Sequence, residues 1–338
     1  MRNFARPTLK DVAQLCGVSE ITVSRVMRGA PHISEKMRTR VLLAVAQLNY
    51  APNRLAGALA SRTSDLLAVI VPSMTHSGFP EVLDGIDSVL SQTRYRTVLG
   101  ISHYDLEQEA ALVDDLLSWN PAAIALAGFE HTDGALRSLR EFSNPVMELM
   151  DADGEPVDLS LGVSHSQAGR MMADHLVERG YRNIGYIGAW NERPSRSVKR
   201  RVAFEKRLLE LGRPLCCRLI REEDSSMLLG RQACEQVIRD YPAVDALFFA
   251  NDDLVAGALL YCLSQGVSVP DQLALAGFNG LPLTEAMPME VTTIKTPRYE
   301  MGVAAAELFL ARVADNADTS AQSRRICMPL TLVQGEST

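Results

Sequence analysis

Residues 8–29, TLKDVAQLCGVSEITVSRVMRG, constrain the fold most strongly because they have the pattern of two short helices joined by a tight turn. Thr8 is a suitable N-cap for the first helix, with Asp11 three residues later as in a capping box. Gly17 suits the left-handed residue that ends a helix, and Ser19 can cap the next helix at once. This geometry is typical of a helix-turn-helix that fits the major groove of DNA.

Apolar residues at helical spacing give each of these helices one inward face. They are Leu9, Val12, Ala13 and Cys16 in the first helix and Val23, Val26 and Met27 in the second. The outer face of the second helix is left with Glu20, Ile21, Ser24, Arg25 and Arg28. An ordinary amphipathic helical hairpin would show the same pattern, so the pattern alone leaves both interpretations open.

Charge is distributed unevenly along the chain, whose formal net charge is −7. Residues 1–62 contain ten Lys or Arg and three Asp or Glu residues, a net charge of +7. The rest of the chain contains 24 basic and 38 acidic residues, a net charge of −14. A small basic module joined to a large acidic one is typical of a DNA-binding domain with a separate sensor domain.

After Arg62, apolar runs typical of buried strands alternate with amphipathic helical stretches. The strand-like runs form two series, 66–72, 97–102, 122–128 and 145–151, then 183–189, 217–222, 246–252 and 273–280. The helical stretches include 81–92, 107–118, 166–180 and 198–211. Repeated strand–helix units with apolar strands predict parallel sheets covered on both faces. Two series predict two lobes, with a ligand site in the cleft between them, beyond the carboxyl ends of the strands.

The motifs of common catalytic and cofactor sites are absent from the sequence. It has no GxxxxGK[ST] loop, GxSxG elbow, HExxH or CxxC pair, and its six histidines show no metal-ligand spacing. The six cysteines form no paired framework, so we expect reduced thiols. We therefore expect a protein that is not an enzyme and uses no metal or cofactor.

Two further absences bear on where the protein is found. No run approaches the roughly 20 apolar residues of a membrane span. The N-terminus, MRNFARPTLKD, has no apolar core of a signal peptide. We expect a cytoplasmic protein.

The basic segment and its continuation resemble the LacI family of transcriptional repressors. The matching residues are TLKDVA (8–13), GVS (17–19), TVSRV (22–26), LNY (48–50) and PNR (52–54), with Leu59 before Ala60. The resemblance extends over essentially the whole chain and implies a small all-α helix-turn-helix DNA-binding domain followed by a two-lobed α/β sensor like a periplasmic binding protein. One such module reads a half-site, so it also implies a homodimer on a palindromic DNA operator.

The family also implies a domain organisation. Residues 1–62 would form the DNA-binding domain with a hinge helix at about 53–61, and 63–338 the effector-binding and dimerisation domain. The first lobe would comprise about 66–163 and 295–324. The second would comprise about 164–294 and 325–338, with one closing strand near 325–333.

The resemblance assigns roles to residues on the second helix and the hinge. Glu20, Ile21 and Arg25 fall at the base-reading positions, and an arginine there suits bidentate bonding to guanine. Thr22, Ser24 and Asn53 are expected to contact phosphates, and solvated positions on a helix are the alternative for Thr22 and Ser24. Leu59 would be the apolar wedge placed in the minor groove.

The family's effector cleft corresponds to five residues of this chain, Phe79, Asp151, Arg200, Asn251 and Asn279. Phe79 would pack on the ligand, Asp151 and Asn251 would bond its hydroxyls, and Arg200 would grip it. Asn279 stands where most sugar-binding members have aspartate, which removes a negative charge from beside the ligand. With Arg193, Arg196 and Lys199 near Arg200, the cleft is suited to a carboxylate, although a solvated basic helix face would explain these residues too.

LLSWN (116–120), VMELMD (146–151) and AGFNG (276–280) resemble the gluconate-operon repressors within the family. The implied effector is gluconate or a relative such as 2-ketogluconate. Two other classes stay open at this stage. One is a sugar-binding receptor without DNA function, which the charge of the first 62 residues opposes, and the other is an enzyme.

Overall fold

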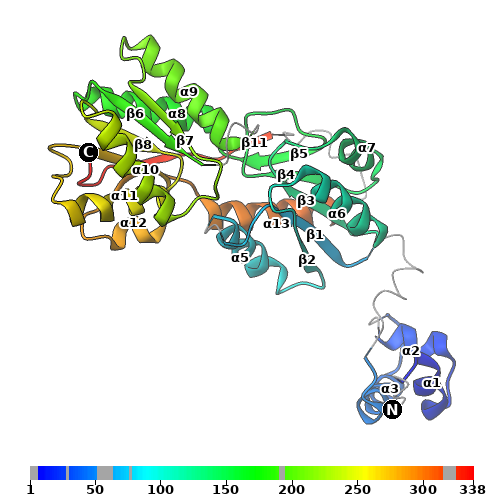
Figure 1. Cartoon of the computed structure of the whole chain (residues 1–338). Helices are drawn as coiled ribbons and strands as arrows, with labels where there is room; N and C mark the ends of the chain where they lie inside the picture. The colour runs from blue at the N-terminus through cyan, green and yellow to red at the C-terminus, as the bar shows by residue number, and fades with distance from the viewer. Residues whose placement is uncertain (1–6, 28–29, 52–63, 76–77, 190–194, 315–324) are drawn as a thin grey trace, which may run out of the picture. The chain divides into compact units, whose positions relative to one another are not determined.

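The computed structural model describes residues 7–27, 30–51, 64–75, 78–189, 195–314 and 325–338, in two compact units, residues 1–64 and 65–338 (Figure 1). The first unit contains α1 (Leu9–Cys16), α2 (Glu20–Met27) and α3 (Glu35–Leu48). Val12, Cys16, Val23 and Val26 are buried together with Val41 of α3. The two predicted helices therefore bury their predicted faces against a third.

Local hydrogen bonds set the ends of α1 and α2 as the sequence predicts. The Thr8 hydroxyl accepts from the Asp11 N–H, and the Asp11 carboxylate accepts from the Thr8 N–H at 2.7 Å. Gly17 ends α1 in the left-handed conformation at φ 58°. The Ser19 hydroxyl then accepts from the Thr22 N–H at 3.2 Å, which caps α2. Four residues within a stretch of twelve therefore fix the two helix ends and the turn between them: Thr8, Asp11, Gly17 and Ser19.

The second unit is built on two six-stranded sheets. The first has the order β11-β5-β4-β3-β1-β2, formed by Arg325–Cys327, Leu159–Gly162, Val146–Leu149, Ala123–Ala127, Leu66–Val71 and Arg96–Ile101. The second has the order β12-β10-β9-β8-β6-β7, formed by Thr331–Val333, Thr292–Lys295, Ala274–Asn279, Ala246–Phe249, Ile184–Gly188 and Cys217–Ile220. The neighbouring strands run parallel except for the antiparallel pair β10–β12.

Helices cover both faces of the first sheet, and with it they form the first lobe (Figure 1). α5 (Gly78–Leu90) and α13 (Arg298–Ala314) pack on the face that carries Leu67 and Val69. α6 (Leu106–Ser118) and α7 (Asp133–Glu141) pack on the face that carries Ala68 and Ile70. Alternate residues of β1 therefore enter different cores, so the strand is apolar at every position.

The second lobe consists of the second sheet and its helices (Figure 1). They are α8 (His165–Glu178), α9 (Arg196–Glu210), α10 (Met227–Asp240), α11 (Asp252–Gln265) and α12 (Pro282–Ala286). α8 packs against α9, and α10 packs against α11. A three-helix unit followed by a two-lobed α/β unit confirms the predicted fold class.

The chain passes between the lobes after β5, after β10 and between β11 and β12. The sequence predicts a single closing strand near 325–333 in the second lobe, but the structure has two short strands there, one in each lobe. Residues Arg325–Cys327 pair with β5 in the first sheet, and only Thr331–Val333 pair with β10 in the second. The segment divides because Pro329 lies between the two strands and cannot donate to a sheet ladder.

The cysteines are free thiols, and Cys16, Cys217, Cys234 and Cys262 are buried. In the part of the chain that the structure describes, we find no helix with the length and apolar character needed to cross a membrane.

Glycines allow α5 and α13 to approach closely. A Cβ on Gly302 would overlap the Val82 carbonyl oxygen, and one on Gly85 would overlap the Tyr299 carbonyl oxygen. Neither backbone atom can move without shifting a helix. We therefore expect Gly302→Ala to destabilise the second unit by roughly 1–3 kcal/mol, the range for overpacking.

Gly134→Ala is the matched control, since a Cβ there meets nothing closer than 3.6 Å in α7. It should leave the unfolding midpoint unchanged or raise it slightly. Urea unfolding followed by circular dichroism compares the two variants with wild type. Equal midpoints for Gly302→Ala and Gly134→Ala would contradict the close packing of α5 on α13.

Candidate functional site

The outer face of α2 presents the side chains that the sequence assigns to base recognition. Glu20, Ile21 and Arg25 are exposed, and Ile21 is 72% exposed although it is apolar. Thr22 and Ser24 are half-buried beside them. Because α2 is anchored through its buried face, this outer face is a fixed surface. Asn53 and Leu59, the other residues expected to contact DNA, lie outside the described residues.

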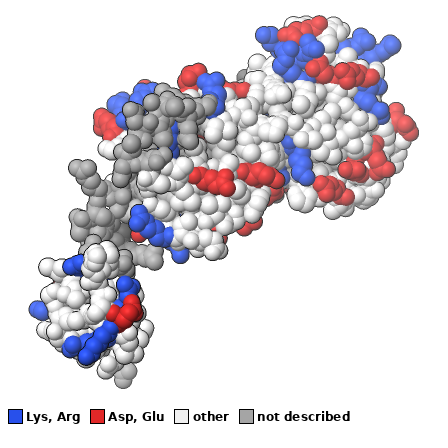
Figure 2. All heavy atoms as spheres, turned by 180° about the vertical axis from the view of Figure 1, so that it is seen from behind, with Lys and Arg blue, Asp and Glu red and all other residues white. Residues whose placement is uncertain are grey.

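Charge on the two units follows the sequence division. Figure 2 shows several separate groups of Lys and Arg atoms and less acidic surface on the visible face of the first unit, whereas acidic and basic side chains are interspersed on the second. The surface of the first unit therefore suits an anionic partner better than that of the second.

A cavity of about 600 Å³ lies between the two lobes of the second unit. Strand ends from both sheets line it. Ser102 follows β2 and Met150 follows β4, whereas Asn251 follows β8 and Asn279 ends β9. This is the predicted position at the carboxyl ends of the strands, and the volume is that of a small-molecule site.

Arg200 is a buried cation in the cavity wall. Its guanidinium stacks 3.6 Å above the ring centre of Phe278 and donates to the Ala250 carbonyl (2.6 Å) and His165 Nδ1 (2.9 Å). Its Nε is enclosed and has no hydrogen-bond partner. Burial lowers the pKa of Arg200 to about 10, so it is charged at neutral pH. No carboxylate among the described residues forms an ion pair with it.

His165 links Arg200 to the first lobe. Its Nε2 lies 3.0 Å from the Met150 carbonyl, which can only accept, and its Nδ1 faces Arg200, which can only donate. The partners therefore require a neutral imidazole protonated at Nε2. Burial, together with the charges of Arg200 and Arg196, holds the pKa of His165 well below its usual range, which agrees with this state.

Arg196 lies one turn before Arg200 on α9 and also lines the cavity. Its guanidinium lies 5.3 Å from the ring centre of Phe79, and its Nη1 is enclosed without a hydrogen-bond partner. The Ser195 side chain does not cap α9, and among the described residues no side chain accepts from the first N–H groups of this helix, whose N-terminus lies at the cavity. Two guanidinium groups and a helix N-terminus thus present positive charge to one part of the cavity.

Four of the five expected effector residues line this cavity: Phe79, Arg200, Asn251 and Asn279. Asn251 is also the N-cap of α11, where its Oδ1 accepts from the Leu254 N–H at 3.1 Å. The backbone of Asn279 has φ 121°, a value that residues other than glycine rarely adopt. Its side-chain amide makes no hydrogen bond to another described residue and is free to bond a ligand.

Asp151 occupies a different place from the one expected. Its side chain is fully buried, does not line the cavity, and accepts from Lys199 Nζ at 2.5 Å and from the Asp153 N–H at 2.8 Å. Lys199 also lies 3.1 Å from Glu130. Because Lys199 belongs to the second lobe and both acids to the first, the cluster joins the lobes. Its ion pairs occupy both Asp151 and Lys199, which the sequence had placed beside the ligand.

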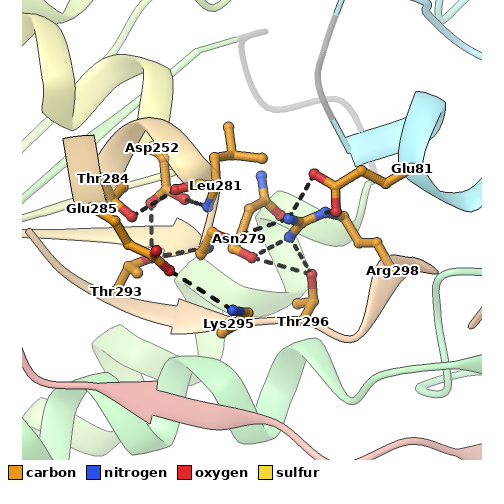
Figure 3. A network of polar contacts seen from close by, with 11 residues as sticks. Glu81, Asp252, Asn279, Leu281, Thr284, Glu285, Thr293, Lys295, Thr296 and Arg298 are labelled. Carbon is orange, nitrogen blue, oxygen red and sulfur yellow. Dashed lines mark hydrogen bonds and ion pairs between the residues drawn. The ribbon is translucent and has the colours of Figure 1, made fainter. Parts of the chain in front are cut away.

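Arg298, which the sequence analysis did not single out, makes a third connection between the lobes (Figure 3). It begins α13 of the first lobe and donates to both oxygens of Glu81 on α5, at 3.0 and 3.1 Å. It also donates to the backbone carbonyls of Asn279 and Gly280 in the second lobe. The backbone that holds Asn279 in its unusual conformation is thus tied to the helix that carries Phe79.

Behind this connection, Asp252 fixes the loop that follows β9 (Figure 3). Its buried carboxylate accepts from the Leu281 N–H at 2.8 Å and from the Thr293 hydroxyl at 2.7 Å. Burial raises the pKa of Asp252 to about 6. These bonds hold the cavity wall of the second lobe from behind.

Glu109, His131 and Glu148 form a buried acid–base–acid cluster in the first lobe. His131 Nδ1 lies 2.6 Å from Glu109, and Nε2 lies 3.4 Å from Glu148. Burial lowers the pKa of His131, but its hydrogen bond to Glu109 and its ion pair with Glu148 outweigh burial and raise the pKa to about 9. Glu109 also lines the cavity. Within the described ranges, no group of three or more His, Cys, Asp or Glu side chains is arranged to hold a metal ion.

Comparison with family models gives two matches. Residues 8–53 match "Bacterial regulatory proteins, lacI family", and residues 173–338 match "Periplasmic binding protein-like domain". The chain is 35% identical to the HTH-type transcriptional regulator GntR of Escherichia coli over 314 residues, which cover 93% of this chain and 94% of that protein.

Solved structures that are similar over the whole length include the following two. A LacI-family transcriptional regulator from Silicibacter pomeroyi has a TM-score of 0.92 and 39% identity, covering 98% of this chain and 99% of that one. The Lac repressor dimer bound to operator and the anti-inducer ONPF has a TM-score of 0.84 and 26% identity, covering 98% of each chain.

His131 is expected to make stability depend on pH. Its folded-state pKa of about 9 exceeds the unfolded value of about 6.5, so folding takes up a proton between these values. The stabilisation is therefore complete below about pH 6.5 and is lost as pH rises through about 9; it amounts to roughly 3 kcal/mol at most. Between about pH 7 and 10, the melting temperature of wild type should fall more steeply than that of His131→Gln. Parallel pH profiles would contradict the ion pairs of His131.

Proposed function

The chain belongs to the LacI family of bacterial regulatory proteins, and we propose that it is a homodimeric repressor of sugar-acid catabolism genes that gluconate releases from a palindromic operator. Residues 1–62 serve as the DNA-binding domain with its hinge, and 63–338 as the effector-binding and dimerisation domain. The proposed role involves no catalysis and takes place in the cytoplasm. The alternative effectors are 2-ketogluconate and other sugar acids.

The proposal that the effector is an acid rests mainly on Arg196 and Arg200. Each lines the cavity with an enclosed N–H that lacks a hydrogen-bond partner, and neither has a carboxylate paired with it in the described residues. An unpaired buried donor costs free energy of about 1–3 kcal/mol, more when it is charged. A ligand carboxylate in the cavity would be attracted by the charge of both guanidinium groups and by the adjacent helix N-terminus, and small shifts of the two side chains would bring their unpartnered N–H groups onto it.

DNA recognition is assigned to the fixed outer face of α2. Arg25 would bond a guanine, Glu20 would accept from a cytosine amino group, and Ile21 would meet a thymine methyl. The exposure of Ile21 supports this, because an apolar side chain that packs on nothing in its own unit is available to a base. Thr22, Ser24 and Asn53 would hold phosphates, and Leu59 would enter the minor groove.

The switch follows from a ligand that touches both lobes. Phe79 belongs to the first lobe, whereas Arg200, Asn251 and Asn279 belong to the second. Closing the cleft would displace the first lobes across the dimer interface, so that the two hinges no longer meet on DNA. A ligand shifts this equilibrium only by its preference for one conformation, typically 1–3 kcal/mol in allosteric proteins.

Operator release tests the proposal. Fluorescence anisotropy with DNA from the protein's own promoter region should show specific binding at moderate salt. Gluconate should then weaken that binding by about 5–150-fold. A panel of sugar acids and neutral sugars in calorimetry identifies the effector. Absence of specific DNA retention would exclude the regulator and favour a plain sugar-binding receptor, and tighter binding of neutral sugars would exclude the acidic effector.

In the same assay, Arg196→Gln should weaken gluconate binding by about 10-fold or more, since a charge-assisted hydrogen bond contributes about 1.5–3 kcal/mol. Operator affinity without ligand should stay near wild type. Arg207→Gln is the matched control, because Arg207 lies on the same helix but pairs with Asp174 and Glu210 away from the cavity. Equal effects of the two changes on gluconate affinity would count against a carboxylate at Arg196.

Arg25→Ala should cost roughly 1–3 kcal/mol on the operator and much less on unrelated DNA, because the lost bond reads a base. Arg38→Ala, which removes one charge from α3 of the same unit, serves as the control. It should weaken both DNAs alike. Competition binding with operator and scrambled duplexes measures the ratio, and an unchanged ratio for Arg25→Ala would remove it from the base-reading residues.

A further inference from the structure

We propose that Glu109 is an additional effector-binding residue, which accepts hydrogen bonds from the hydroxyls remote from the ligand carboxylate and excludes a second acidic group there. This inference rests on the proposed function. It gives the bound sugar acid a direction, with its carboxylate on the second lobe and its far end on the first.

The first support is the place of Glu109. It lies in the first turn of α6, is only 7% exposed, and yet lines the cavity. Its exposed neighbour on the same helix, Glu107, does not line the cavity. A charged side chain is rarely so far buried unless it is paired or has a role.

The second support is how the carboxylate is held. His131 engages one oxygen, Oε1, at 2.6 Å, and its own side chain is fully buried. Glu148 supports His131 from the far side and is anchored by accepting from the Val157 N–H at 2.6 Å. This chain fixes the rotation of Glu109 in advance, which lowers the cost of ordering it around a ligand.

The second oxygen of Glu109 is the one available to a ligand. Oε2 makes no hydrogen bond to another described residue, and it is not one of the enclosed, unpartnered polar atoms of the described chain. Because Glu109 lines the cavity, we infer that this oxygen is the one that faces it. It can only accept, so it matches hydroxyl donors.

Charge adds selectivity at this end. A protonated His131 between two carboxylates leaves the cluster with a net charge of −1, whereas Arg196 and Arg200 of the other lobe are positive. A ligand with one carboxylate and a hydroxylated tail fits both ends. A ligand with an acid at each end places one of them beside Glu109, where like charges repel.

The test compares gluconate with glucarate, its counterpart with carboxylates at both ends, by calorimetry on the full chain. Wild type should bind gluconate at least about 10-fold more tightly than glucarate. Glu109→Gln keeps the size of the side chain and removes its charge, so this ratio should fall by about 10-fold or more. Glu107→Gln, the matched control on the same helix, should keep the wild-type ratio.

A purely structural role for the cluster predicts a different result. Glu109→Gln would then lower the melting temperature while the gluconate-to-glucarate ratio stayed at the wild-type value, and that outcome overturns the inference. If Glu109→Gln does not fold, a measurement on the wild type tests the inference instead. The wild type should bind gluconate about 10-fold more tightly than 6-deoxygluconate, which lacks the terminal hydroxyl. Equal affinities would overturn the inference. Wild type that binds no sugar acid overturns the proposed function itself, and this inference with it.

Discussion

The buried guanidinium of Arg200 is the interaction around which the second unit is organised. A cation removed from water needs compensation, and here its partners are neutral: a ring face, a backbone carbonyl and an imidazole nitrogen. These partners bond or stack on the guanidinium group, but being neutral they do not cancel its charge. The positive field of Arg200 therefore reaches the cavity, whereas a carboxylate partner would have removed it. The same requirement keeps His165 neutral, because a protonated imidazole could not accept from Arg200.

The links between the lobes are polar, which bears on how the protein changes conformation. His165 bonds the Met150 carbonyl, Lys199 pairs with Asp151 and Glu130, and Arg298 reaches two carbonyls of the other lobe. Water can replace each of these partners when the lobes separate, so their net contribution is small compared with burial of an apolar interface. Each lobe meanwhile keeps its own apolar core. Lobes that are internally rigid and joined by exchangeable bonds suit a switch that a ligand can bias.

The sequence predicted best the parts that local interactions determine. The helix-turn-helix was predictable because Thr8, Asp11, Gly17 and Ser19 act within four residues of the helix ends they set. Eight of the strands coincide with apolar runs, but β5 and β10 do not. Each has only four residues, including serine in β5 and two threonines in β10, so the pairing with neighbouring strands determines them.

The site residues that the sequence missed depend on distant partners. Glu81 and Arg298 are 217 positions apart, and Glu109 and His131 are 22 apart on different elements. No pattern of spacing marks such pairs. The family resemblance located Phe79, Arg200, Asn251 and Asn279 at the cavity, because the fold fixes where strands end. It misplaced Asp151, whose carboxylate is occupied by Lys199, since a resemblance transfers backbone positions and not the pairing of side chains around them.

If the effector is a sugar acid, as we propose, the two guanidinium groups in the cavity wall account for its preference over a neutral sugar of the same size. A site that presents donors rejects a ligand without the matching acceptor strongly, because its own buried groups then lose their water without gaining a partner. A neutral sugar would place no opposite charge beside Arg196 and Arg200, whereas a ligand carboxylate would. Asn279 preserves the positive charge of the cavity because it is neutral. An aspartate at this position would compensate part of that charge. In this proposal the discrimination comes less from the fit around the hydroxyls than from two cations that form no direct ion pair with a carboxylate among the described residues.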